Sequence, residues 1–148
     1  MSEEQNDISK ARRRITRDPP WILCVDDEKG VTDVVKYHLM KAGYQVDVAH
    51  NGEDALKLCN EKEYALILLD IKMPGKSGLD ILAQIRQINP KTHVIMLTAI
   101  SATDAIINAF KNFASAYITK PFTKDTLLRK VKFVLSIQKL PSDLSDRF

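Results

Sequence analysis

The chain has 148 residues, of which 45% are hydrophobic, and its 22 Lys and Arg against 19 Asp and Glu give a formal charge of +3 at pH 7. This length allows one globular domain with a sizeable core and is short for two. The small positive excess does not imply nucleic-acid binding. Because residues 1–20 hold no apolar signal-sequence core and no stretch approaches the roughly 20 apolar residues of a membrane span, we expect a cytoplasmic protein that does not bind membranes.

The N-terminal segment 1–18 is polar and charged, and Asp18-Pro19-Pro20 separates it from the first apolar run. We predict a disordered, basic extension here. An alternative is that Arg12, Arg13, Arg14 and Arg17 form a basic arm for an anionic partner. A folded domain is expected over residues 19–139, followed by a polar tail over 140–148.

From Trp21 onward, short apolar runs alternate with longer amphipathic segments, a pattern typical of α/β architecture. The predicted strands are WILCVDD (21–27), YQVDVAH (44–50), ALILLD (65–70), HVIMLT (93–98) and AYIT (116–119). The predicted helices cover residues 30–43, 51–63, 77–90, 101–113 and 123–138. Gly43 is expected at the end of the first helix, Asn51 and Thr123 are expected as N-caps, and Pro90 stops the third helix.

Strand-helix-strand units of this length require right-handed crossovers in a parallel sheet, so the helices should divide between its two faces. The sequence therefore predicts a doubly wound sheet of five parallel strands with five helices. The most apolar runs, 22–25, 66–69 and 94–97, should be central, and the alternating run 44–50 should lie nearer the edge. In such sheets, ligands bind outside the carboxyl ends of the strands.

Polar residues follow the predicted strands at that edge. They are Asp26, Asp27 and Glu28 after the first strand, Asp70 at the end of the third, Thr98 after the fourth and Lys120 after the fifth. Three carboxylates in a small volume repel one another unless a cation neutralises them. A pocket of oxygen ligands without His or Cys suits Mg²⁺.

Asp70 is accordingly the candidate nucleophile for a phosphoryl group, with the cation and Lys120 stabilising charge on the transferring oxygens. Each residue also has an ordinary structural interpretation when taken alone. Asp70 and Thr98 could cap helices, the two acids after the first strand could be a loop pair, and Lys120 could be a surface lysine.

Four motifs in this order, CVDDE (24–28), LLDIKMPGKSG (68–78), VIMLTA (94–99) and YITKPF (117–122), closely resemble the receiver domain of two-component response regulators. The resemblance runs from about Trp21 to about Gln138. It implies a flavodoxin-like, CheY-like fold with strand order 2-1-3-4-5. It also implies that Asp70 accepts a phosphoryl group from a phosphohistidine on a sensor histidine kinase or a histidine phosphotransfer protein.

The resemblance further implies roles around Asp70. Asp27 and Asp70 would coordinate Mg²⁺ or Mn²⁺ directly, with the backbone carbonyl of Lys72 as a third ligand and Asp26 acting through water. Thr98, the backbone amide of Ala99 and Lys120 would hold the phosphoryl oxygens. Such a domain is a signalling switch rather than an enzyme, although it catalyses its own Mg²⁺-dependent phosphorylation and dephosphorylation.

The resemblance also implies a cis peptide bond at Lys120-Pro121, which would aim the lysine inward, and a switch formed by Thr98 and Tyr117. When Thr98 moves toward the phosphoryl group, the Tyr117 ring would turn into the vacated space. This would repack the face made by the predicted helix 101–113, strand 116–119 and helix 123–138. Met73, Pro74 and Gly78 are interpreted as shaping the loop after Asp70.

The chain departs from the family pattern at two places. Phe113-Ala114 stand where receivers commonly carry Gly-Ala, so this loop is expected to differ in shape. Lys72 and Ile100, each two residues beyond a site residue, would look over the site. A long cation and an apolar side chain there would screen the acyl phosphate, so we expect slow autodephosphorylation.

The output is left open by the sequence. Only KLPSDLSDRF follows Gln138, so we expect either a stand-alone receiver or part of a longer regulator, with Ile106, Ile107 and Phe110 as a candidate apolar partner surface. Homodimerisation also stays open.

A phosphorylation-independent interaction module is the main alternative. A phosphatase would want an acid where Lys72 stands, and a dinucleotide carrier would want a Gly-rich turn in place of DDEKG.

Overall fold

The computed structural model describes residues 20–73, 77–99 and 113–137. Its elements are β1 (Trp21–Val25), α2 (Lys29–Lys41), β2 (Gln45–Ala49), α3 (Gly52–Glu61), β3 (Leu66–Asp70), α4 (Gly78–Ile88), β4 (His93–Ala99), β5 (Ala116–Lys120) and α6 (Lys124–Ser136). Several predictions lie outside the described residues: the extension 1–18 with its four arginines, Pro74, Ile100, the helix 101–113 except Phe113 (with Ile106, Ile107 and Phe110), and the tail 140–148.

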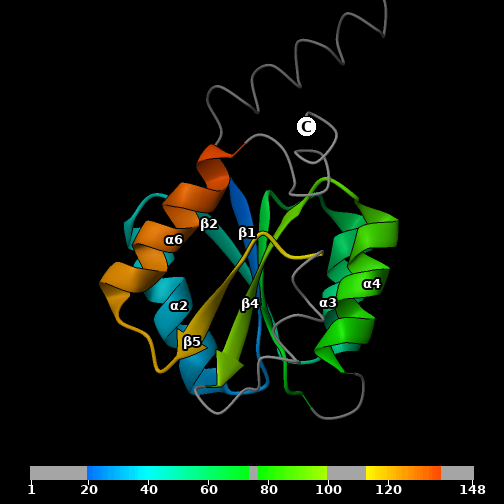
Figure 1. The fold of residues 1–148 in the computed structure, drawn as a ribbon, viewed down its shortest axis with the longest axis horizontal. Coiled ribbons are helices and arrows are strands. Elements are labelled where there is room, and N and C mark those ends of the chain that lie inside the picture. The colour runs from blue at the N-terminus through cyan, green and yellow to red at the C-terminus, as the bar shows by residue number, and fades with distance from the viewer. Residues whose placement is uncertain (1–19, 74–76, 100–112, 138–148) are drawn as a thin grey trace, which may run out of the picture.

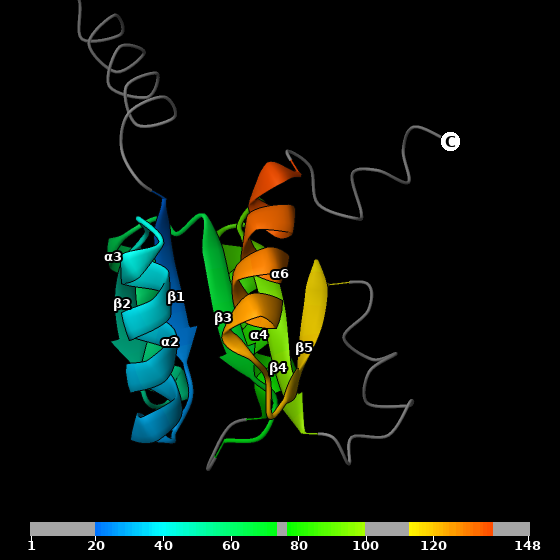
Figure 2. The same ribbon diagram turned by 90° about the vertical axis from the view of Figure 1, so that its left-hand side faces the viewer.

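The five strands form one parallel sheet in the order β2-β1-β3-β4-β5, which confirms the predicted order. Helices α2 and α6 cover one face of the sheet, and α3 and α4 cover the other (Figure 1 and Figure 2). The three most apolar strands, β1, β3 and β4, are the inner ones, and β2 and β5 are the edges, as predicted.

Alternation along the inner strands builds a core on each face of the sheet. On β1, Ile22 and Cys24 pack toward α2 and α6, whereas Leu23 and Val25 pack toward α3 and α4. All four side chains are fully buried. A strand covered on both faces needs apolar residues at every position, and this explains why these runs show no polar alternation.

Short polar side chains cap the starts of three helices, and a glycine follows the end of α2. Asn51 accepts a hydrogen bond from the backbone N–H of Asp54 (2.8 Å), and Thr123 accepts one from that of Thr126 (3.1 Å), so both predicted N-caps are confirmed. Ser77 caps α4 in the same way. Helix α2 ends at Lys41, and Gly43 follows with a φ of 100°, a backbone conformation that favours glycine.

The loop before β5 is held by Arg86 of α4. Its guanidinium donates to the Phe113 carbonyl from Nε (2.9 Å) and Nη2 (2.7 Å), and to the Thr92 carbonyl from Nη1. Neither Phe113 nor Ala114 has a positive φ. The arginine thus braces a turn that has no glycine. Within the described ranges, no helix has the length and apolar character needed to cross a membrane.

Candidate functional site

The carboxyl ends of four neighbouring strands bring the predicted site residues to one edge of the sheet. Asp26 directly follows β1, Asp70 ends β3, Thr98 is the penultimate residue of β4, and Lys120 ends β5. After β1 the chain crosses to α2 on one face, and after β3 it crosses to α4 on the other face (Figure 1). This divergence makes the edge beside β1 and β3 the expected place for a ligand.

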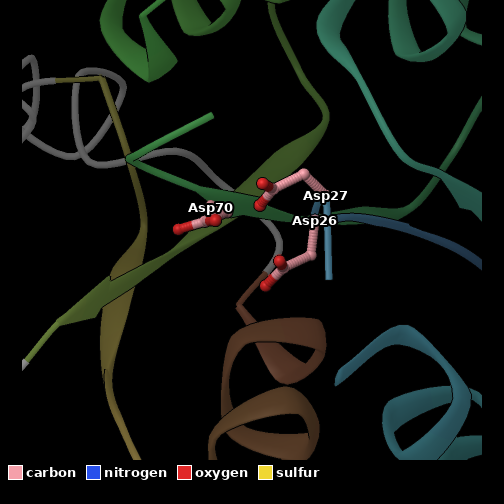
Figure 3. A group of neighbouring side chains, drawn as sticks. All are labelled: Asp26, Asp27 and Asp70. Carbon is pink, nitrogen blue, oxygen red and sulfur yellow. The ribbon is translucent and has the colours of Figure 1, made fainter. Parts of the chain in front are cut away.

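Three carboxylates meet at this point. Asp26, Asp27 and Asp70 each offer an oxygen, and these oxygens all lie within 4.8 Å of one another. Figure 3 shows the Asp27 carboxylate pointing toward Asp70, with Asp26 beside them. Asp26 is fully buried and Asp70 is 6% exposed, whereas Asp27 is exposed. The structure therefore assembles the acidic cluster that the sequence predicts.

Lys120 is the positive charge in this cluster. Its Nζ lies 2.5 Å from Asp26 Oδ2 and 3.5 Å from Asp70 Oδ2. Burial lowers the pKa of the ammonium group, but the hydrogen bond to Asp26 and the charges of Asp70 and Asp26 outweigh burial and raise it above its ordinary value. The lysine is therefore charged. Its bond to Pro121 is cis.

The surroundings of Asp70 disfavour the ionised form of its carboxyl group. Burial, followed by the charge of Asp26, raises the pKa of Asp70 to about 6, although Lys120 and the Lys72 N–H (3.3 Å from Oδ1) act in the opposite direction. One lysine does not balance three carboxylates. This surplus of negative charge is what a divalent cation would relieve.

The donor set fits a hard cation. The ligands on offer are the carboxylate oxygens of Asp26, Asp27 and Asp70. Burial raises the pKa of the neighbouring Cys24 thiol to about 12, so it remains protonated and is a poor ligand. Oxygen donors without thiolate or imidazole suit Mg²⁺ or Mn²⁺.

A cavity of about 160 Å³ lies beside the Asp70 carboxylate. Its walls are Glu28, Asp70, Ile71, Lys72, Thr98, Ala99 and Lys120. Thr98 is buried, and its hydroxyl donates to the Ala99 carbonyl (3.3 Å). A larger cavity of about 590 Å³ opens at the opposite edge, near Tyr64 and Thr92, but it contains none of these groups. We place the chemistry in the smaller cavity because the convergent charges lie there.

The loop after Asp70 depends on Gly78. A Cβ at Gly78 would lie 2.8 Å from the Cα and the carbonyl oxygen of Ile71 and 3.0 Å from the Asp70 carbonyl oxygen. Any other residue would push against the backbone that positions Asp70. Met73 packs into the core below this loop.

Tyr117 lies on β5 opposite Met96 and does not line the cavity. Its side chain is 46% exposed. Lys130 of α6 donates to the Tyr117 carbonyl (2.7 Å), and its Nζ lies 5.2 Å from the ring centroid. Sequence reasoning missed Lys130, because nothing in the spacing of a charged helix face shows which lysine meets the strand.

Comparison with known proteins shows what the chain resembles. The family model "Response regulator receiver domain" matches residues 22–132. The transcriptional regulatory protein DltR of Streptococcus agalactiae (strain NEM316) is 40% identical over 111 residues, which are 75% of this chain and 50% of DltR. The uncharacterized transcriptional regulatory protein YkoG of Bacillus subtilis is 37% identical over 114 residues, 77% of this chain and 50% of YkoG. The chain thus spans about half the length of these curated relatives.

Solved structures agree in fold. A CheY-like receiver domain protein from Methanospirillum hungatei matches with a TM-score of 0.77 and 32% identity, covering 81% of this chain and 96% of its own. NtrX from Brucella abortus, solved in complex with ADP, matches with a TM-score of 0.78 and 30% identity over 88% of this chain and 30% of its own.

Proposed function

The chain belongs to the receiver domain family of two-component response regulators, and from this premise we propose that it accepts a phosphoryl group on Asp70. The donor would be a phosphohistidine on a sensor histidine kinase or a histidine phosphotransfer protein. The observation that carries this proposal is the position of Asp70, whose buried carboxylate lies 3.5 Å from Lys120 and lines a cavity shared with Thr98. We place this reaction in the cytoplasm on the basis of the family.

Metal binding through an aspartate cluster is general in this family. In this chain, Asp27, Asp70 and the Lys72 carbonyl would hold Mg²⁺ or Mn²⁺, and Asp26 would act through water. The cation would supply the positive charge that the three carboxylates lack.

In the transfer step, an oxygen of the Asp70 carboxylate forms a bond to phosphorus. The phosphorus–nitrogen bond of the phosphohistidine breaks, and its electron pair stays on the imidazole. Lys120 moves from Asp26 toward the phosphoryl oxygens, and the Thr98 hydroxyl and the Ala99 N–H donate to them. These three donors would stabilise the negative charge on the phosphoryl oxygens in the transition state. Such stabilisation is the main way in which a protein accelerates phosphoryl transfer.

Phosphorylation of Asp70 would change the surface of the domain through movements of Thr98 and Tyr117. As Thr98 turns from the Ala99 carbonyl toward the phosphoryl group, the exposed Tyr117 ring would turn inward. The face that changes comprises β5, α6 and the segment that precedes Phe113, and this face would bind the output or a second copy of the chain.

The output is either a domain joined to this receiver in a longer protein or a separate partner. Two relatives that are about twice as long as the matched segment are named transcriptional regulatory proteins. We therefore propose that residues 19–139 form a receiver, flanked by a basic extension at 1–18 and a polar tail at 140–148. This receiver would control an output in transcriptional regulation without itself binding nucleic acid or membranes.

The test is incubation of the purified chain with acetyl phosphate, with Mg²⁺ or with EDTA, followed by intact mass measurement beside Asp70→Asn. A gain of one phosphoryl group that requires both Mg²⁺ and Asp70 supports the proposal. If acetyl phosphate and a panel of phosphorylated histidine kinases and phosphotransfer proteins all fail, the phosphorylation-independent interaction module becomes the better account.

A further inference from the structure

Hydrogen bonds fix the backbone of Glu28, but its side chain does not cap the helix that it precedes. It is the N-cap residue of α2, and its carbonyl accepts hydrogen bonds from the N–H groups of Val31 (3.1 Å) and Thr32 (3.2 Å). Its own N–H donates to Asp26 Oδ1 (3.0 Å). The side chain, however, does not cap the helix, and within the described part of the chain its carboxylate has no hydrogen bond or ion pair.

Glu28 is one of the residues that line the cavity beside Asp70. The other acids near the site have partners or a role already, since Asp26 is bonded to Lys120 and Asp27 belongs to the cluster that would hold the cation and does not line the cavity. The charged groups that share the cavity with Glu28 and Asp70 are Lys72 and Lys120, which can only donate hydrogen bonds. Of the two acids that line the cavity, Asp70 would carry the phosphoryl group, so Glu28 is the carboxylate left to accept a hydrogen bond there.

The cavity has room for a water molecule after phosphorylation. Its volume of about 160 Å³ is several times the volume, about 30 Å³, that one water molecule occupies in the liquid, which leaves space for water beside a phosphoryl group. A water that attacks phosphorus must turn a lone pair toward it and its hydrogens away. A carboxylate on the cavity wall favours this orientation because it accepts one of those hydrogens.

We propose that Glu28 orients the water that hydrolyses the aspartyl phosphate and so sets the lifetime of the phosphorylated state. This inference rests on the proposed function. Water oxygen forms a bond to phosphorus while the bond from phosphorus to the Asp70 oxygen breaks, and that electron pair restores the Asp70 carboxylate. One water proton stays on the new P–OH, and the other, held by Glu28, passes to a phosphoryl oxygen to give dihydrogen phosphate.

A purely structural role for Glu28 is the competing explanation. A negative charge at the start of a helix stabilises it through the helix dipole, whatever happens in the cavity. Glu53 provides a matched control, because it is an exposed acid in the first turn of α3. Glu28→Gln, Glu28→Ala and Glu53→Gln should therefore be compared after loading with acetyl phosphate and Mg²⁺, removal of the donor and measurement of released phosphate.

Glu28→Ala should release phosphate about threefold to tenfold more slowly than the wild type, the value of one hydrogen bond to the attacking water. Glu28→Gln, which keeps an acceptor oxygen but loses the charge, should be slowed less, and Glu53→Gln should not be slowed. Added formate should restore the rate of Glu28→Ala, whereas sodium chloride at equal ionic strength should not, because only formate returns a carboxylate to the cavity. Release at the wild-type rate by Glu28→Ala, or equal slowing by Glu53→Gln, would overturn the inference while leaving phosphorylation of Asp70 intact. A wild-type chain that takes up no phosphoryl group from acetyl phosphate or from the panel of phosphorylated histidine kinases and phosphotransfer proteins would overturn the proposed function and this inference with it.

Discussion

Lys120 and Asp26 form a buried ion pair beneath the candidate phosphorylation site, with Nζ 2.5 Å from Oδ2 and the aspartate side chain fully buried. The same ammonium group is farther from Asp70, at 3.5 Å. Lys120 must therefore weaken its bond to Asp26 before it can hold phosphoryl oxygens. A divalent cation near Asp26 would make that movement easier, because it supplies the neutralising charge that the lysine gives up.

Lys120→Met should leave the Asp26 charge buried without a partner. Removing one member of a buried ion pair costs about 3 kcal/mol or more, so the free energy of unfolding in EDTA should fall by about that amount. Mg²⁺ should recover part of the loss, and phosphoryl uptake should be abolished. Urea unfolding with and without Mg²⁺ measures this, and Lys132→Met, at an exposed position of α6, is the control. Equal stability of the two variants in EDTA would contradict the account.

Asp70→Asn should stabilise the fold while removing the acceptor. The pKa of Asp70 is raised to about 6 by burial and by Asp26, so the carboxylate that is present at pH 7 destabilises the folded state relative to the unfolded chain. Since one pKa unit corresponds to about 1.4 kcal/mol, removing the charge should stabilise the chain by on the order of 2 kcal/mol in EDTA. Thermal unfolding at neutral pH tests this. A lower midpoint for Asp70→Asn would show that the acidic cluster carries no such cost.

The phosphorylated state should be long-lived, because Lys72 lines the same cavity as Asp70 and its ammonium group would screen the acyl phosphate from attacking water. Phosphate release from the purified phosphoprotein should take minutes or longer, and Lys72→Ala should shorten this time. Lys91→Ala, at an exposed position outside the site, should leave it unchanged. A wild-type lifetime of seconds would refute the expectation.

Lys130→Met should ease the turning of Tyr117. Lys130 holds the Tyr117 carbonyl and lies over its ring, and an exposed cation–π contact is worth about 0.5–1 kcal/mol. Its loss should favour the inward ring, and because coupling between the ring and the site is reciprocal at equilibrium, the chain should bind beryllofluoride, a phosphoryl analogue, about twofold to fivefold more tightly in the presence of Mg²⁺. Lys132→Met serves as the control. An unchanged affinity would mean that Lys130 does not restrain the switch.

His93 should make stability depend on pH. Its ring nitrogens contact Ser115 Oγ (2.8 Å) and the Ile137 carbonyl (2.7 Å). Burial lowers the pKa of His93, the Arg86 charge lowers it further, and the Ile137 carbonyl opposes both. The unfolded chain therefore takes up this proton near the ordinary pKa of 6.5 while the folded chain does not, so stability is present above pH 6.5 and is lost as pH falls toward the folded-state pKa.

Urea unfolding at about pH 7.5 and pH 5.5 measures this slope. Because other groups also titrate in this range, the quantity of interest is the difference between the wild type and His93→Gln. The wild type should lose more stability on acidification than the variant. The same loss in both would show that His93 does not carry the effect.

Sequence patterns predicted the strands, their central and edge positions and two helix caps, because burial on both faces and capping leave local signals. They did not show which side of a helix meets the sheet. In α2, Val35 and Leu39 are buried while Val34, Tyr37 and Met40 are about half exposed, although all five are apolar. The face is set by where the helix lies on the sheet, which is a tertiary property.

The candidate site shows the same division. Strand ends located its acids, Thr98 and Lys120, since parallel strands bring their carboxyl ends to one edge. The preference of Lys120 for Asp26 and the open carboxylate of Glu28 depend on distances of a few ångströms between loops, and no spacing encodes them. The bracing of Phe113 by Arg86 was likewise beyond the pattern.

The most direct test of the central claim is to locate the phosphoryl group. Borohydride reduces an aspartyl phosphate to homoserine, so treating the phosphorylated chain and mapping its peptides by mass identifies the modified residue. The account predicts homoserine at Asp70, only in samples phosphorylated with Mg²⁺ present. Homoserine at Asp26 or Asp27, or a phosphorylated chain with no change at Asp70, would contradict it.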